Sequence, residues 1–250
     1  MRLLRKLIGI VIALGVLLGI WLIALQTSGL NRALLPGPMD VLRAAEHHPS
    51  TLLSATWTTA QGALGGFVLG NLVGVLLAVI VARSVLASRL VLPLAIAVRV
   101  IPVVALAPLL TLVLGRGLVT VVTIAGLLVF FPTLINCIFG LRSVSQDQLD
   151  MMRMINASQW HVFLRLRLPA ALPSLFAAFR VAAAAAVLGA MLAEWVASGA
   201  GLGYLILRSS LTFEVGLMWA AVIVAVLITV GAAALTGAIG RRLVHWETVD

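Results

Sequence analysis

Several runs of about 20 apolar residues restrict the fold of this chain more than any other feature. A helix of that length crosses the hydrocarbon core of a bilayer, and inside the bilayer every backbone polar group needs an internal partner. A mean hydropathy of +1.19 agrees with a membrane environment. The sequence therefore predicts an all-α, polytopic membrane protein with six transmembrane helices. We place them at residues 7–25, 56–82, 90–114, 118–140, 170–197 and 215–238.

The spans leave little of the chain for water-soluble structure. We expect residues 1–250 to form a single transmembrane domain, with no ATPase domain and no extracellular binding domain. The first span could instead be a signal peptide. Its length of about 19 residues and the lack of a clear small-residue cleavage site favour an uncleaved helix. Because we expect no ATPase domain in these residues, the energy for any transport must come from outside this chain.

The net charge of +9 is explained by topology and not by nucleic-acid binding. In the six-span arrangement eleven basic residues fall on one side and four on the other, and the basic side is cytoplasmic. The eleven are Arg2, Arg5, Lys6, Arg83, Arg89, Arg142, Arg153, Arg165, Arg167, Arg241 and Arg242, and the four are Arg32, Arg43, Arg116 and Arg208. We therefore expect both termini in the cytoplasm, with attraction to anionic lipid headgroups.

A glycine appears at every fourth position of the second span, at Gly62, Gly66, Gly70 and Gly74. Residues four apart lie on one face of a helix, so this face has almost no side chains and lets another helix approach closely. The pattern predicts a packing seam. The neighbouring helix could belong to the same subunit or to a second copy.

Charged residues and prolines inside apolar runs are candidates for a pathway. Prolines at 93, 102 and 108 interrupt the third span and allow kinks there. Arg99 and Glu194 are expected in structural ion pairs or gates more than as substrate ligands, because a charge in the bilayer must pair or face water. We take Arg99, Pro102 and Glu194 as the candidate pathway residues. Arg180 is expected to extend toward the cytoplasmic surface.

The polar segment Ser145 to Pro169 stands out between two apolar runs. Ser145 followed by Gln148 is a capping box, which predicts the start of a short helix with Leu149, Met152 and Ile155 on its apolar face. Asn156 favours a left-handed turn, and Ser158 can cap a second short helix that ends before Leu168-Pro169. The sequence thus predicts an exposed elbow of two helices.

This segment resembles the cytoplasmic loop of the permeases of binding-protein-dependent ABC importers, whose motif is Glu-Ala-Ala, three residues, Gly, and later Leu-Pro. The matching groups are Asp150-Met151-Met152, Asn156-Ala157-Ser158 and Leu168-Pro169. Further groups look like the nitrate, sulfonate and taurine members of that family. They are Leu35-Pro36-Gly37-Pro38, Arg99 to Pro102, Ala107-Pro108, and Ala193-Glu194 followed by Ser198 to Tyr204.

The resemblance implies that residues 145–168 are a coupling loop that docks on a separate ATPase subunit. It assigns ATPase coupling to Asp150, Met151, Met152, Arg153, Asn156, Ala157, Ser158, Leu168 and Pro169. Asp150 keeps the charge of the family's Glu, and Asn156 keeps access to the turn of its Gly. Met151 and Met152 replace two alanines, which implies a partner groove shaped for bulky, flexible side chains.

The resemblance also implies the partners of the chain. We expect two ABC ATPase subunits that use ATP and Mg, a second permease copy in a twofold homodimer, and an external substrate-binding protein, all at the cell (inner) membrane. The chain itself should bind no cofactor and catalyse no reaction. The substrate is a small solute of the sulfonate, nitrate, taurine or vitamin-precursor type, which the binding protein selects.

A self-sufficient secondary transporter or channel is the alternative. Glu194 is the only acidic residue suited to proton or sodium coupling inside a span, and no inverted repeat is evident, which disfavours it. A metal site at Glu46-His47-His48 is also disfavoured, because adjacent histidines point in different directions.

Overall fold

The computed structural model describes residues 12, 15–16, 18–26 and 35–244, except for the side chains of Val98 and Arg99. Helices make up nearly all of this described part, and it contains no strand. The helices are α2 Pro38–His47, α3 Pro49–Arg83, α4 Val85–Val100, α5 Val103–Leu114, α6 Leu118–Arg142, α7 Gln146–Met154, α8 Gln159–Val162, the π-helix η1 Phe163–Arg167, α9 Leu168–Ala197, α10 Leu202–Leu211 and α11 Val215–Leu243. The all-α prediction is confirmed.

Four helices among the described residues are long and apolar enough to cross a membrane. They are α3, α6, α11 and a continuous helix from Gln159 to Ala197 that contains α8, η1 and α9. The first predicted span, 7–25, lies partly outside the described residues, and those of its residues that are described are helical. The predicted number of six spans is therefore not confirmed.

The prediction of one helix over residues 90–114 is wrong. The chain breaks into α4 and α5 at Ile101 and Pro102, which both have extended backbone. A residue that precedes proline avoids the α conformation, and Pro102 has no N–H to continue the helix. Pro93 and Pro108 do not interrupt a helix, since each lies inside one.

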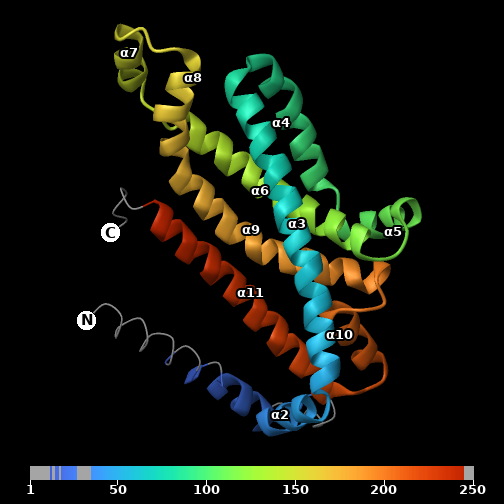
Figure 1. Cartoon of the computed structure of the whole chain (residues 1–250). Coiled ribbons are helices and arrows are strands. Elements are labelled where there is room, and N and C mark those ends of the chain that lie inside the picture. Colours follow the sequence, from blue (N-terminus) through green and yellow to red (C-terminus); the bar gives the residue numbers. More distant parts are fainter. Residues whose placement is uncertain (1–11, 13–14, 17, 27–34, 245–250) are drawn as a thin grey trace.

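The core forms where α3, α6 and α9 pack together (Figure 1). Small side chains from α6 and α9, among them Ala125, Ala186 and Ala190, are almost completely buried between these helices. A buried hydrogen bond of 2.6 Å from the Thr133 hydroxyl to Asn71 Oδ1 also links α6 to α3. Helices with such small residues can approach closely, which is how membrane helices gain packing energy.

The glycine seam packs against α6 of the same chain. A Cβ added at Gly62 would lie 2.6 Å from a methyl of Val121, and one at Gly70 would lie 2.5 Å from the carbonyl oxygen of Gly126. At Gly66 it would meet Ala125 and come within 2.9 Å of a backbone nitrogen, and at Gly74 it would lie 3.0 Å from the Phe130 carbonyl oxygen. The sequence did not show which subunit supplies the neighbouring helix. In the structure this helix is α6 of the same chain.

Figure 1 shows that the molecule has two distinct ends. The elbow, α7 and α8, projects from one end, close to the end of α6 and the start of α9. At the opposite end lie α2, α10 and the beginning of α3 and α11. The candidate coupling and pathway residues of the sequence analysis lie at the elbow, near the end of α9 and at the break between α4 and α5.

Candidate functional site

The elbow begins with the predicted capping box. The Gln148 N–H donates to Ser145 Oγ at 3.3 Å, and the Ser145 N–H donates to Gln148 Oε1 at 3.1 Å. These two bonds satisfy N–H groups that the first turn of α7 would otherwise leave without partners. The helix therefore starts at a fixed residue in an otherwise exposed segment.

The turn of the elbow depends on Asn156. Its φ of 52° is left-handed, and the N–H groups of Asn156 and Ala157 donate to the carbonyl oxygens of Arg153 (2.9 Å) and Met152 (3.0 Å). This is a Schellman motif, in which a left-handed residue lets the chain satisfy the last carbonyls of a helix. Ser158 then caps the next helix, since its hydroxyl accepts from the His161 N–H at 3.2 Å. The predicted turn is therefore present.

The second helix of the elbow does not end before Leu168, contrary to prediction. It continues through the five-residue π-helix η1 directly into α9. Pro169 cannot donate a backbone hydrogen bond and would crowd the carbonyl four residues earlier in a regular α-helix. The wider π turn lies directly before this proline and accommodates it. Leu168 and Pro169 are half-buried at the start of α9, away from the outer surface of the elbow.

The outer surface of the elbow is apolar and exposed. No residue of α7 is buried, and Met151, Met154 and Ile155 are 66%, 79% and 67% exposed. The predicted apolar face of Leu149, Met152 and Ile155 did not include Met154, and of its three residues Leu149 and Met152 are half-buried whereas Ile155 is exposed. Exposed apolar groups of this kind mark a surface for contact with another protein or with a membrane.

The charge of Asp150 is paired within α7. Arg153 Nη1 donates to Asp150 Oδ1 at 2.7 Å, and both side chains are exposed. Such a surface pair adds little stability, so a partner can separate the two groups at low cost. Asp150, Met151, Arg153 and Asn156 all lie on the exposed elbow, while Ala157 is half-buried.

Glu194 lies far from the elbow, completely buried near the end of α9. Its Oε2 accepts from the Gly203 N–H at 2.8 Å, and the hydroxyl of Thr59 on α3 accepts from the Leu202 N–H at 2.8 Å. Two N–H groups of the first turn of α10 are thus held by side chains of α9 and α3. Within the described residues, which leave out the side chain of Arg99, Glu194 is held by a backbone N–H and forms no ion pair, so its expected role in an ion pair or a gate stays a prediction.

The glycines after Glu194 fit around its carboxyl group. Gly201 has φ 98°, a left-handed value that favours glycine, and a Cβ there would overlap the Glu194 carboxyl group. A Cβ at Gly203 would overlap the backbone of Met191. The motif from Ala193 to Tyr204 is therefore a tightly packed joint between α9, α10 and α3. We call it the Glu194 joint.

The break between α4 and α5 exposes backbone that is not helical. Val100, Ile101 and Pro102 are all exposed, Val100 at 74%. The 16 residues of α4 measure about 24 Å along the helix axis, which is shorter than a hydrocarbon core about 30 Å thick. Arg99 belongs to α4, but its side chain lies outside the described residues.

Arg180 is exposed and lies beside α11, where its side chain borders Gly237. Within the described part of the chain, no group of three or more His, Cys, Asp or Glu residues could hold a metal ion.

The described residues thus form a helical bundle with several membrane-length apolar helices and a capped, exposed elbow between two of them. Residues 70–245 match the family of binding-protein-dependent transport system inner membrane components, and the chain belongs to this family. Its members are permease subunits of ABC transporters and are not enzymes; the ATPase is a separate subunit. The chain is thus a membrane subunit that works with an ATPase and a substrate-binding protein.

Three relatives illustrate the family. A probable ABC transporter permease protein of Haemophilus influenzae is 35% identical over 86% of this chain and 88% of its own length. The riboflavin transport system permease protein RibX of Chloroflexus aurantiacus is 35% identical over 96% of this chain and 90% of its own. The formylaminopyrimidine transport permease protein ThiX of Halalkalibacterium halodurans is 32% identical over 79% of each chain.

Proposed function

We propose that this chain forms the translocation pathway of an ATP-driven importer and that its elbow, residues 145–168, docks on the ATPase subunits. The exposed elbow carries this proposal. Its exposed Met151, Met154 and Ile155 offer an apolar docking surface, and its second helix continues into α9 without a loop. The ATPase subunits, two per transporter, bind ATP and Mg, whereas this chain binds no cofactor and acts as a single transmembrane domain over residues 1–250.

We further propose that two copies of the chain form a homodimer around the pathway. The exposed, non-helical residues Ile101 and Pro102 support this, because irregular backbone within a membrane is tolerated only against protein or water and not against lipid. The neighbouring α5 has only 12 residues, and its Leu112 and Val113 are 85% and 79% exposed. A second copy would cover this region. Arg99 and Pro102 would then border the pathway. Glu194 would help to close the pathway by holding the end of α9 against α10.

The basic residues support an orientation with both termini in the cytoplasm. The elbow, with Arg153, Arg165 and Arg167, shares one end of the molecule with the last residues of α6, and Arg208 of α10 lies at the opposite end (Figure 1). This distribution is the one expected when the elbow end is cytoplasmic.

The substrate we propose is a small solute handed over by an external binding protein. Two relatives with 35% and 32% identity are named for riboflavin and for formylaminopyrimidine, which favours the vitamin-precursor type over sulfonate, nitrate or taurine.

Replacement of Asn156 by Val tests the docking of the elbow. A β-branched residue resists the left-handed conformation, so we expect the elbow to misfold locally and transport to fall at least about tenfold, with normal membrane insertion. Asn156→Gly is the matched control, since glycine adopts the same φ and should keep most of the activity. The measurements are co-purification with the ATPase and substrate-stimulated ATP hydrolysis in vesicles. Full coupling in the Val variant would contradict the proposed role of the elbow.

Reconstitution of the chain without ATPase subunits separates an importer subunit from a secondary transporter. We expect no uptake of riboflavin or of pyrimidine precursors above the rate of empty vesicles under proton, sodium or voltage gradients. The same vesicles with the ATPase, the binding protein and ATP provide the control. Gradient-driven uptake by the chain alone would establish the alternative function.

A further inference from the structure

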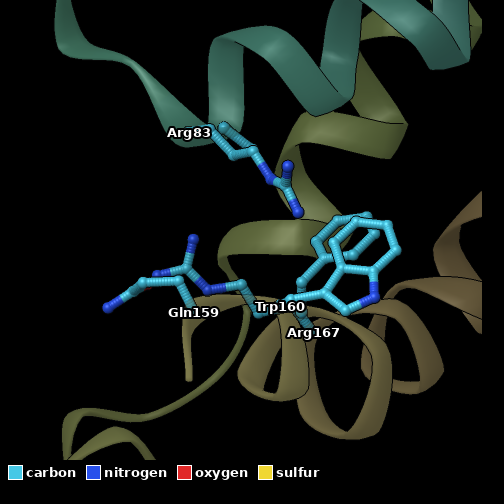
Figure 2. Close-up of a pocket in the computed structure, with 6 residues that line it drawn as sticks. Arg83, Gln159, Trp160 and Arg167 are labelled. Carbon is cyan, nitrogen blue, oxygen red and sulfur yellow. The ribbon is translucent and has the colours of Figure 1, made fainter.

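A cavity of about 560 Å³ lies where the end of α3 meets the base of the elbow. Its lining consists of Ala82, Arg83, Gln159, Trp160, Phe163 and Arg167. Figure 2 shows Arg83 extending from the end of its helix toward the aromatic rings, with Gln159, Trp160 and Arg167 on the facing helix. The site therefore joins two segments that are more than 70 residues apart in the sequence.

Aromatic rings hold Arg83 in place. The centre of its guanidinium group lies 4.5 Å from the centre of the Phe163 ring and 5.2 Å from that of Trp160. The two rings stack on each other at 5.7 Å with an angle of 21° between their planes. Stacking uses the face of a guanidinium group and leaves the N–H groups around its edge free to donate. Arg83 thus contacts both rings and still has N–H groups with which to bind a ligand.

The positive charges of the cavity have no acidic partner within the described residues. The two ion pairs there are Arg43 with Asp40 and Arg153 with Asp150, neither of which involves Arg83 or Arg167. The lining contains no Asp or Glu, and Gln159 adds an amide. Two guanidinium groups and an amide suit a phosphate group, because guanidinium donors match the geometry of phosphate oxygens.

The position of the cavity identifies the source of the phosphate. Arg83 is the last residue of the apolar helix α3, and Arg167 directly precedes the apolar helix α9. Both residues thus lie at ends of apolar helices that are long enough to cross a bilayer, and Trp160 is a residue type that favours the level of the lipid headgroups. Basic pockets between membrane helices bind anionic headgroups.

We propose that this cavity binds the headgroup phosphate of an anionic phospholipid, held by Arg83 and Arg167. The outer surface of the elbow is left for the ATPase, because its most exposed side chains, Met151 and Met154, belong to α7 and do not line the cavity. The proposal requires that α3 and α9 cross a bilayer, and it does not depend on the docking of an ATPase.

Native mass spectrometry of the full chain in detergent tests the proposal, with dioleoylphosphatidylglycerol as the probe and dioleoylphosphatidylcholine for comparison. We expect Arg83→Gln and Arg167→Gln each to weaken phosphatidylglycerol binding about tenfold, which is the loss of one charge-assisted interaction. Arg116→Gln, at an exposed arginine between α5 and α6 on the side predicted to carry few basic residues, is the control and should bind like wild type. Phosphatidylcholine should bind weakly to all four proteins.

Three results would overturn the proposal. The first is equal binding of phosphatidylglycerol by wild type and both cavity variants. The second is complete displacement of the lipid by millimolar inorganic phosphate, which would show a free phosphate ion to be the ligand. The third is unchanged lipid binding together with lost ATPase co-purification, which would assign the cavity to that subunit. If Arg83→Gln fails to fold, Arg167→Gln still tests the proposal, because the contacts with the rings of Trp160 and Phe163 are made by Arg83.

Discussion

Gly66→Leu should abolish the stable fold of this chain while leaving its insertion into the membrane intact. Even a Cβ at this position would overlap Ala125 and approach the backbone of α6, which cannot move aside as a side chain can. Leucine favours insertion, and lipid gives no driving force to bury it, so the substitution should separate α3 from α6. We expect normal membrane targeting and loss of the monodisperse peak in mild detergent by size-exclusion chromatography.

Two control substitutions distinguish this effect from a general cost of leucine. Gly231→Leu replaces a glycine of α11 that has no atom within 4 Å of its would-be Cβ, and Val68→Leu changes an exposed residue of α3 itself. Both should keep the wild-type elution profile. If Gly66→Leu behaved like these controls, the close contact between α3 and α6 would be wrong.

Thr59→Val should lower the melting temperature in detergent by about 5 °C. Valine has nearly the shape of threonine but leaves the buried Leu202 N–H without its acceptor, a loss of about 1–3 kcal/mol in a chain of this size. Glu194→Ala should have a larger effect, because it removes the acceptor of the Gly203 N–H and also leaves a cavity. Glu194→Gln should fall between Glu194→Ala and wild type, since its amide oxygen can still accept.

Thr58→Val is the matched control for the Glu194 joint. The Thr58 hydroxyl donates to the carbonyl oxygen of Ser54 in its own helix, so its loss should change the melting temperature by less than about 1 °C. Similar melting temperatures for Thr59→Val and Thr58→Val would show that the joint contributes little to stability.

The elbow could be predicted because its signals are local. A capping box connects residues three apart, and the left-handed preference of Asn156 belongs to a single residue. The glycine seam was also readable, since a four-residue repeat needs only the geometry of one helix. The identity of its neighbour, α6, required the fold.

The errors arose where distant residues or neighbouring prolines decide the structure. Hydropathy cannot show whether a proline bends a helix or ends it, and of the three prolines in residues 90–114 only Pro102 separates two helices. The contact of Glu194 with Gly203 was not predicted, because its partner is a backbone N–H and not a charged side chain. The signal was present in Gly201 and Gly203, whose lack of side chains makes room for the carboxyl group and for Met191.

The continuous helix from Gln159 to Ala197 has a mechanical consequence. Its 39 residues form a rod about 58 Å long, with the elbow turn at one end and Glu194 near the other. A tilt of about 5° imposed at the elbow would shift the far end by about 5 Å, more than the length of a hydrogen bond. A bond of 2.8 Å from Gly203 to Glu194 ties that end to α10, and a bond of 2.8 Å from Leu202 to Thr59 ties α10 to α3. A shift of this size at the far end would therefore have to carry α10 with it or break one of these bonds.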